Sequence, residues 1–275
     1  MAAPPVAASE LDRLWARLRA VTPARIGLAR AGAATSTRET LAFQAAHARA
    51  RDAVEASFDT DGLAAAVEAR GLKPLRLKSR ADDLTAYLAR PDLGRALDGA
   101  SRARLGAEPK GFDLVIVLAD GLSARATTTH APPLIDAALP ALVSEGWRVG
   151  PAAIVERGRV AIGDEIGVGL DAALVAVLIG ERPGLTAPDS LGVYLTWAPR
   201  PGRSDAERNC LSNVRPEGLP YAEAARRLVL LCRAARRLKL TGVGLKDESE
   251  AAPAVLGPAP TLAETQTARS SARSA

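Results

Sequence analysis

Apolar residues in the first hundred positions recur three or four apart, which is the spacing of an amphipathic helix. Ser36 and Glu39 have the spacing of a capping box and predict a helix that continues to about Ser57. Residues 1–106 are therefore expected to form a mostly helical N-terminal domain. Further helices in it are expected to begin at Ser9, Asp61 and Pro91.

The pattern changes after Gly111 to short, continuous apolar runs that are rich in valine and isoleucine. Such runs, bounded by polar residues and glycine, are typical of strands that are buried on both faces. Helical segments separate them, and this alternation predicts an α/β fold over residues 107–245, with a mostly parallel, Rossmann-like sheet flanked by helices. Strands are expected at 112–119, 152–155, 173–179 and 191–197, and helices at 132–145, 163–170 and 220–238.

The two ends of the chain differ in composition from the rest. Residues 246–275 consist largely of alanine, proline, threonine, serine and arginine, and a disordered tail is expected there. Residues 1–8 are expected to be disordered as well.

Charge and composition narrow the class of protein. The net charge is +5, but arginine alternates with acidic residues and aromatics make up only 3% of the chain, which favours solvated helix faces over a nucleic-acid surface. No run of 18 apolar residues predicts a membrane span, and the first residues lack the apolar core of a signal peptide. We expect a soluble cytoplasmic protein that binds neither nucleic acid nor membrane.

Familiar catalytic motifs are missing from the sequence. The two histidines, His47 and His130, lie far apart, and His130 is expected in a loop before two prolines. No spacing typical of a zinc site, a nucleophile elbow or a P-loop occurs. Gly167, Gly169 and Ala172 match a dinucleotide fingerprint, but they precede a predicted strand instead of following one, so they are interpreted as the end of a helix.

Three polar segments follow predicted strands instead. Asp120–Ser123 follows the first buried run, Gly180–Leu185 the third, and Asn209–Asn213 lies beyond the fourth as a loop. Ligands of open α/β sheets bind outside the carboxyl ends of the strands. The segments offer no activated nucleophile and no acid–base pair, which favours a surface that binds a cofactor carrying the chemistry itself.

These segments also carry a resemblance to a known family. Over roughly Ala24–Asp247, the sequence resembles the small (light) subunit of ethanolamine ammonia-lyase. The motifs that carry the resemblance are Tyr87–Arg95, Asp120–Ser123, Gly158–Val160, Gly180–Leu185 and Asn209–Asn213, in this order.

The resemblance implies a lyase that depends on adenosylcobalamin and converts ethanolamine into acetaldehyde and ammonia by a radical mechanism. A large subunit, a barrel, would hold the substrate, and the two kinds of subunit would form a hetero-oligomer that encloses the corrin ring. The cobalamin contacts of the family fall here on Val160, Glu181 and Cys210. Val160 would pack on apolar parts of the ring, Glu181 would accept hydrogen bonds, and Cys210 would be a soft contact. The absence of an Asp-x-His-x-x-Gly motif implies that no histidine of this chain replaces the cofactor's own base on cobalt.

Two alternatives stay open at this stage: packaging of the protein in a bacterial microcompartment, and a stand-alone function without a partner chain. Members of the family often carry a long N-terminal extension linked to packaging in a bacterial microcompartment, whereas about 20 residues precede the matching region here. The short extension counts against packaging. The second alternative is a stand-alone, nucleotide-binding α/β regulatory protein, which rests on the fold class and the fingerprint match alone.

Overall fold

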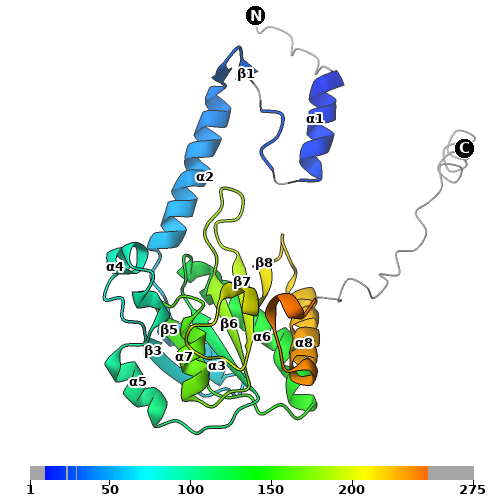
Figure 1. Ribbon diagram of the computed structural model, residues 1–275. Coiled ribbons are helices and arrows are strands. Elements are labelled where there is room, and N and C mark those ends of the chain that lie inside the picture. Colours follow the sequence, from blue (N-terminus) through cyan, green and yellow to red (C-terminus); the bar gives the residue numbers. More distant parts are fainter. Residues whose placement is uncertain (1–9, 23, 29, 247–275) are drawn as a thin grey trace, which may run out of the picture. The chain divides into compact units, whose positions relative to one another are not determined.

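The computed structural model describes residues 10–22, 24–28 and 30–246. The tails expected at 1–8 and 246–275 therefore lie outside the described residues, except for Lys246. Six strands form one sheet in the order β3-β5-β4-β6-β7-β8 (Figure 1). The first four strands of this order run parallel, β7 is antiparallel to β6, and β8 is antiparallel to β7. The predicted α/β class with a mostly parallel sheet is confirmed. The strands are β3 Pro74–Lys78, β4 Leu114–Ala119, β5 Ala152–Glu156, β6 Leu174–Gly180, β7 Leu191–Trp197 and β8 Asn209–Val214.

Strand β3 was missed by the sequence interpretation, which expected a mostly helical domain over residues 1–106. It pairs with β5 at the edge of the sheet. Leu75 and Leu77 are buried and Arg76 between them is exposed. An edge strand needs one apolar face only, and two leucines among lysine and arginine do not form the continuous run that marks a central strand. The first 106 residues therefore contribute a strand to the sheet.

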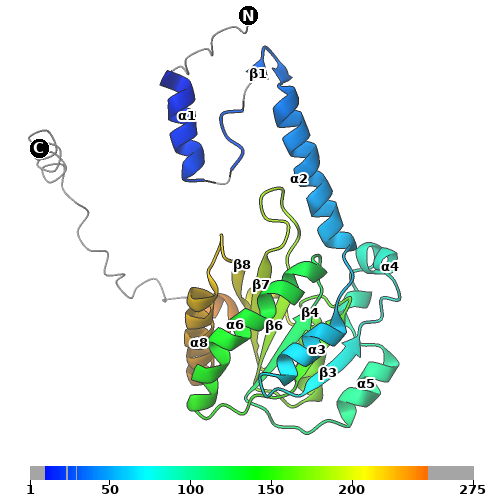
Figure 2. The same ribbon diagram turned by 180° about the vertical axis from the view of Figure 1, so that it is seen from behind.

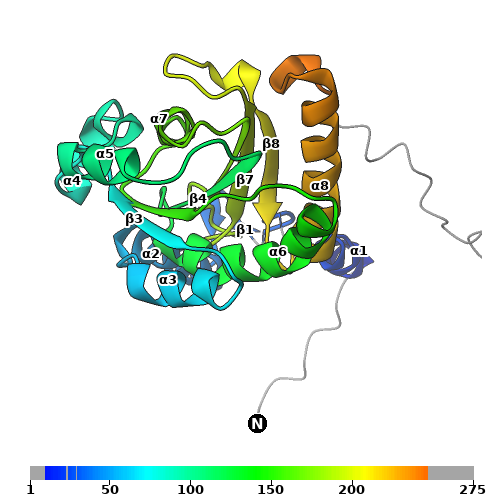
Figure 3. The same cartoon turned by 90° about the horizontal axis from the view of Figure 1, so that it is seen from below.

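Helices cover both faces of the sheet. Helices α3, α6 and α8 pack with one set of alternate strand residues, and α5 and α7 pack with the other set (Figures 2 and 3). All seven residues of β6 are buried, because both of its faces are covered. The helices are α1 Glu10–Ala20, α2 Thr37–Glu55, α3 Thr60–Glu68, α4 Leu84–Ala89, α5 Gly99–Gly106, α6 Ala124–Ser144, α7 Ile162–Gly169 and α8 Tyr221–Leu238, with short 3-10 turns η1 Leu93–Arg95, η2 Asp205–Glu207 and η3 Gly242–Gly244 and a small hairpin of β1 Arg30–Ala31 and β2 Ala34–Thr35.

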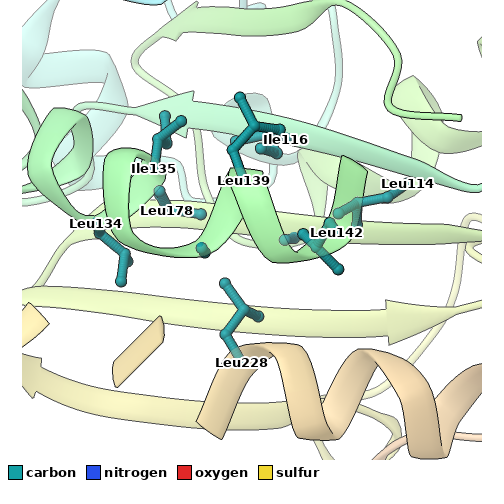
Figure 4. A pocket seen from close by; sticks show the side chains of 10 residues that line it. Leu114, Ile116, Leu134, Ile135, Leu139, Leu142, Leu178 and Leu228 are labelled. Atoms are coloured by element: carbon teal, nitrogen blue, oxygen red, sulfur yellow. The ribbon is translucent and has the colours of Figure 1, made fainter. Parts of the chain in front are cut away.

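The core between α6, α8 and the sheet contains a cavity of about 10 Å³ (Figure 4). Its lining is entirely apolar and includes Leu114, Leu139 and Leu178. A buried water needs at least this much space and two or more polar partners. The cavity is therefore a dry packing gap of the core and offers nothing to a polar ligand.

Helix α6 begins earlier than the sequence pattern predicts. Ser123 caps it by accepting the N–H of Ala126 at 3.3 Å, so the expected loop around His130 is wrong, and His130 lies inside the helix. Prolines 132, 133 and 140 each remove one backbone hydrogen bond of the helix. Its buried side chains, among them Leu134 and Ile135, compensate through packing that the proline signal does not reveal.

The N-terminal helices behave differently from the rest. Helix α2 starts at the predicted cap, where Ser36 accepts the N–H of Glu39 at 3.4 Å. None of the residues of α1 is buried, and its apolar stripe includes Leu11 and Leu14, which are 59% and 51% exposed. No helix among the described residues combines the length and the apolar character that crossing a bilayer requires.

Candidate functional site

Strand direction decides which polar segments meet. Because β7 is antiparallel to β6, the carboxyl end of β7 lies beside the amino end of β6 and not beside its carboxyl end. The expected loop at 209–213 is wrong, since these residues form β8, which returns along β7. Gly180 pairs with Leu191, and Leu191 pairs with Val214, so the ends of β6 and β8 lie together. Residues 209–214 therefore end beside the carboxyl end of β6, although they reach it as a strand and not as the predicted loop.

The segments after β4 and β6 are in direct contact at this edge. The N–H of Leu122 donates to the carbonyl of Gly180 at 3.0 Å. A Cβ at Gly180 would lie 2.0 Å from the carbonyl oxygen of Ser123, and Gly121 has a φ of +60° with its own Cβ position 2.3 Å from the Gly180 carbonyl. Only glycine permits this approach at either position.

Glu181 is half-buried and tied to β8. Its carboxylate accepts hydrogen bonds from the hydroxyl of Ser190 at 2.7 Å, from the hydroxyl of Ser212, and from the backbone N–H of Asn213 at 3.1 Å. The carboxylate lies over Gly192, where a Cβ would be 3.1 Å from Oε1. A carboxylate has about four acceptor positions. Three are used within the chain, so Glu181 retains the capacity to accept one more hydrogen bond.

Cys210 lies on β8 directly opposite Tyr194 of β7. The residue is exposed at the surface. Desolvation nevertheless raises the pKa of its thiol, the hydrogen bond with Tyr194 lowers that pKa, and the charge of Glu181 raises it. The thiol is therefore neutral near pH 7, which suits a soft contact and not a nucleophile.

Tyr194 is the residue that sequence reasoning missed. Burial raises the pKa of its hydroxyl, and the neighbouring Cys210 and Glu181 raise it further. The only signal in the sequence is a single tyrosine at the centre of the apolar run Leu191–Trp197. A tyrosine at that place can pack in the core or line a binding site. Only the pairing of β7 with β8, which places Tyr194 opposite Cys210, distinguishes the two roles.

Val160 lies in the loop between β5 and α7 and is half-buried. It lines a surface groove of about 440 Å³ together with Tyr194, Ala161 and Pro91. Tyr194 thus contributes to the groove and also stands opposite Cys210. The structure places Glu181 and Cys210 close together, and it connects Val160 to them through Tyr194.

Asp120 holds the loop that carries Val160. Its carboxylate accepts the backbone N–H of Arg157 at 2.7 Å, of Gly158 at 3.0 Å and of Gly121 at 2.9 Å. Burial raises the pKa of Asp120 to about 6, although the three backbone hydrogen bonds oppose that rise. Asp120, which the sequence interpretation placed in a polar segment after a strand, is a positioning residue.

A pH-dependent stability is expected from Asp120. Its pKa in the folded chain lies above the ordinary value near 4, so the folded state binds this proton more tightly than the unfolded state. The stabilisation is complete below about pH 4 and is lost as the pH rises to about 6, by up to about 3 kcal/mol. Asp120→Asn does not titrate. The stability of the natural chain relative to this variant should therefore fall between pH 4 and pH 7 in urea unfolding. A relative stability that rises over this range would show that the three N–H groups outweigh the cost of burial.

The fingerprint-like glycines serve packing. They close α7, and a Cβ at Gly167 would lie 2.3 Å from Pro199, whereas one at Gly169 would lie 2.2 Å from Leu105. The helix end precedes β6, as the sequence interpretation expected. The structure therefore gives no support to a dinucleotide fingerprint at this place.

Comparison with known proteins identifies relatives along nearly the whole described chain. A family model described as ethanolamine ammonia-lyase light chain (EutC) matches residues 12–246. The ethanolamine ammonia-lyase small subunit of Ralstonia nicotianae is 54% identical over 240 residues, covering 86% of this chain and 89% of that protein. The small subunits of Azotobacter vinelandii and Pseudomonas aeruginosa are 54% and 52% identical over 242 and 240 residues, covering 86% of this chain and 90% and 88% of those proteins.

Proposed function

Because the chain belongs to the ethanolamine ammonia-lyase light chain family, we propose that it is the small subunit of an adenosylcobalamin-dependent ethanolamine ammonia-lyase. It completes the cobalamin site, and a large subunit holds the substrate. The observation that carries the proposal is the cluster of Glu181, Cys210 and Tyr194 at the end of the sheet, beside the groove of Val160.

The residues of the cluster suit a corrinoid. The ring is large, mostly apolar and fringed with amides. Val160 and the ring of Tyr194 present apolar surface to the groove. The remaining acceptor position of Glu181 suits an amide N–H, and the neutral thiol of Cys210 suits a soft contact. The fit is one of apolar contact and hydrogen bonding, and it requires no ionised nucleophile.

The chain's own residues would bind and orient the cofactor. Asp120 fixes the loop of Val160 through three backbone hydrogen bonds. Ser190 and Ser212 hold the carboxylate of Glu181 in one orientation. When bound, adenosylcobalamin supplies the radical chemistry by which ethanolamine becomes acetaldehyde and ammonia.

A partner chain is supported by the N-terminal helices. Leu11, Leu14 and Val21 are exposed in and just after α1, and Leu41 and Phe43 are exposed in α2. Large apolar side chains that stay exposed along helices are a feature of surfaces that bind another protein. The relatives are named small subunits, and we assign the partner to the large subunit of the same enzyme.

Reconstitution tests the proposal directly. The purified chain is mixed with the large subunit, adenosylcobalamin and ethanolamine, and acetaldehyde is measured. We expect activity only when both chains and the cofactor are present, with omission of each component as the control. Activity of the large subunit that is not stimulated by this chain would contradict the proposal. So would tight binding of NAD or ATP to the isolated chain that is lost when Gly167 and Gly169 are replaced.

A further inference from the structure

We propose that Arg95 and Arg159 bind a phosphate ester at the rim of the Val160 groove, and that this phosphate belongs to the nucleotide tail of the cofactor. The inference rests on the proposed function and adds a residue-level assignment to it. Neither arginine is among the cobalamin contacts that the family resemblance implies, which are Val160, Glu181 and Cys210.

The two arginines come from segments that pack against each other. The backbone N–H of Arg159 donates to the carbonyl of Gly94 at 2.8 Å. A Cβ at Gly94 would lie 2.7 Å from Cγ of Arg159, so the glycine lets η1 approach this side chain closely. Arg95 directly follows Gly94, and both arginines line the groove together with Val160. Two arginines, 64 positions apart in sequence, thus line one opening.

Arg159 is held in place without being neutralised. It donates from Nη2 to the carbonyl of Tyr87 at 2.9 Å, and its guanidinium lies 4.1 Å from the centre of the Tyr87 ring. Its Nε is buried and has no hydrogen-bond partner. A guanidinium has five N–H groups. Among the described residues, no hydrogen bond uses the two N–H groups of Nη1, so these donors, unlike the buried Nε, can serve a phosphate in the groove.

The charges around the groove are unequal. Among the described residues, no carboxylate lies within ion-pair distance of Arg95 or Arg159, whereas Arg203 on the same groove is paired with Glu207. Asp205 also lines the groove, but its carboxylate lies 3.6 Å from Nε of Arg208. Two unpaired positive charges beside an apolar wall suit a ligand that has an apolar ring and one negative charge.

The size of the groove indicates which part of the cofactor it takes. A volume of about 440 Å³ is that of a pocket for one drug-sized ligand, which is too small for a whole corrinoid. The nucleotide tail of cobalamin is drug-sized and carries one phosphodiester next to a flat base. The same phosphate chemistry occurs in free nucleotides, so the experiment must separate the two sources.

Three corrinoids that differ only in the tail provide the test. The complex of this chain with the large subunit is titrated with adenosylcobalamin, with adenosylcobinamide phosphate and with adenosylcobinamide, which has neither phosphate nor base. Binding is measured by equilibrium dialysis from the absorbance of the corrin. We expect Arg95→Gln to weaken binding of the first two ligands by about ten- to a hundredfold, the worth of a charge-assisted hydrogen bond, and to leave the third unchanged. Arg159→Lys should weaken the same two ligands less, because it keeps the charge and loses the planar fork.

A matched control and a second ligand class complete the design. Arg90→Gln removes an arginine that is paired with Asp92 and does not line the groove, so it should change none of the three affinities. Equal weakening of all three corrinoids by Arg95→Gln, or no weakening, overturns the inference. Binding of ADP to the isolated chain that depends on Arg95 assigns the phosphate to a nucleotide and overturns it as well. A natural complex that binds no corrinoid refutes the proposed function itself, a result distinct from the others.

Discussion

Replacing Arg208 with methionine is expected to lower the free energy of unfolding by about 3–5 kcal/mol. Arg208 donates two hydrogen bonds to the carboxylate of Asp164, at 2.7 and 2.8 Å, and a third to the hydroxyl of Thr196 at 2.8 Å. The side chains of Arg208 and Asp164 are 1% and 2% exposed. The variant would leave the carboxylate of Asp164 buried without its counter-ion, and this cost dominates the loss of the pair itself.

The ion pair also connects elements that position the site. Asp164 is on α7, which follows the loop of Val160, and Arg208 immediately precedes β8, which carries Cys210. Loss of the pair should therefore loosen α7 from the end of the sheet as well as lower global stability. Urea unfolding followed by circular dichroism measures the global effect, and proteolysis of the native chain near residue 160 would report the local one.

Two further variants make the result interpretable. Arg90→Met breaks an ion pair with Asp92 whose side chains are both more than half exposed, and it should change stability little. The double variant Arg208→Met with Asp164→Leu removes both charges and should recover part of the loss, because an apolar pair no longer leaves a charge uncompensated. If Arg208→Met cost no more than Arg90→Met, the buried pair would contribute nothing that the exposed pair does not.

Replacing Glu181 with glutamine is expected to weaken binding of adenosylcobalamin to the two-chain complex by at least about tenfold, the cost of losing roughly 1.4 kcal/mol. The carboxylate is the only acidic side chain that ties β6 to β8 at the proposed site among the described residues. Glutamine replaces one acceptor oxygen with an amide donor. If the amide nitrogen takes the place of Oε2, its donor opposes the backbone N–H of Asn213. If it takes the place of Oε1, which accepts only from Ser212, the acceptor position offered to the cofactor is lost.

The structure adds a second effect to this prediction. Because the carboxylate also holds Ser190, Ser212 and Asn213, Glu181→Gln should lower the free energy of unfolding by about 1–3 kcal/mol, which is the usual cost of an unsatisfied buried hydrogen-bonding group. Binding must therefore be measured well below the unfolding transition. Glu217→Gln is the matched control, because the side chain of Glu217 is 74% exposed. If the Glu181→Gln variant bound the cofactor with unchanged affinity, Glu181 would stabilise the sheet and would not contact the cofactor.

The central strands were predictable because each is buried on both faces and reads as an unbroken apolar run. Strand β7 matches its predicted limits, and β4, β5 and β6 match to within two residues. Strand β3 and helix α6 were not predictable in the same way. The alternation of buried and exposed residues in β3 extends over five residues only. In α6, the prolines predict an interruption of the helix, but the packing of its buried side chains maintains the helix through them. Local signals fail where the stabilising energy comes from distant side chains.

The candidate site shows the same division. Val160, Glu181 and Cys210 were selected from motifs, and the structure brings the last two together at one edge of the sheet. Tyr194, which links them to the groove, and Asp120, which holds the loop, were not assigned these roles from sequence. Their roles depend on the pairing of β7 with β8 and on the approach of the loop after β5 to the end of β4.

By itself, the sequence determined the α/β class, the four central strands, the capped start of α2 and the family, because each is encoded in the spacing or identity of neighbouring residues. Only the tertiary structure decided that residues 209–214 are a strand, that β7 and β8 reverse direction, and that Arg95 and Arg159 share a groove with Val160. The direction of a strand and the approach of distant loops follow from long-range packing and backbone pairing. Neither leaves a periodic trace in the chain.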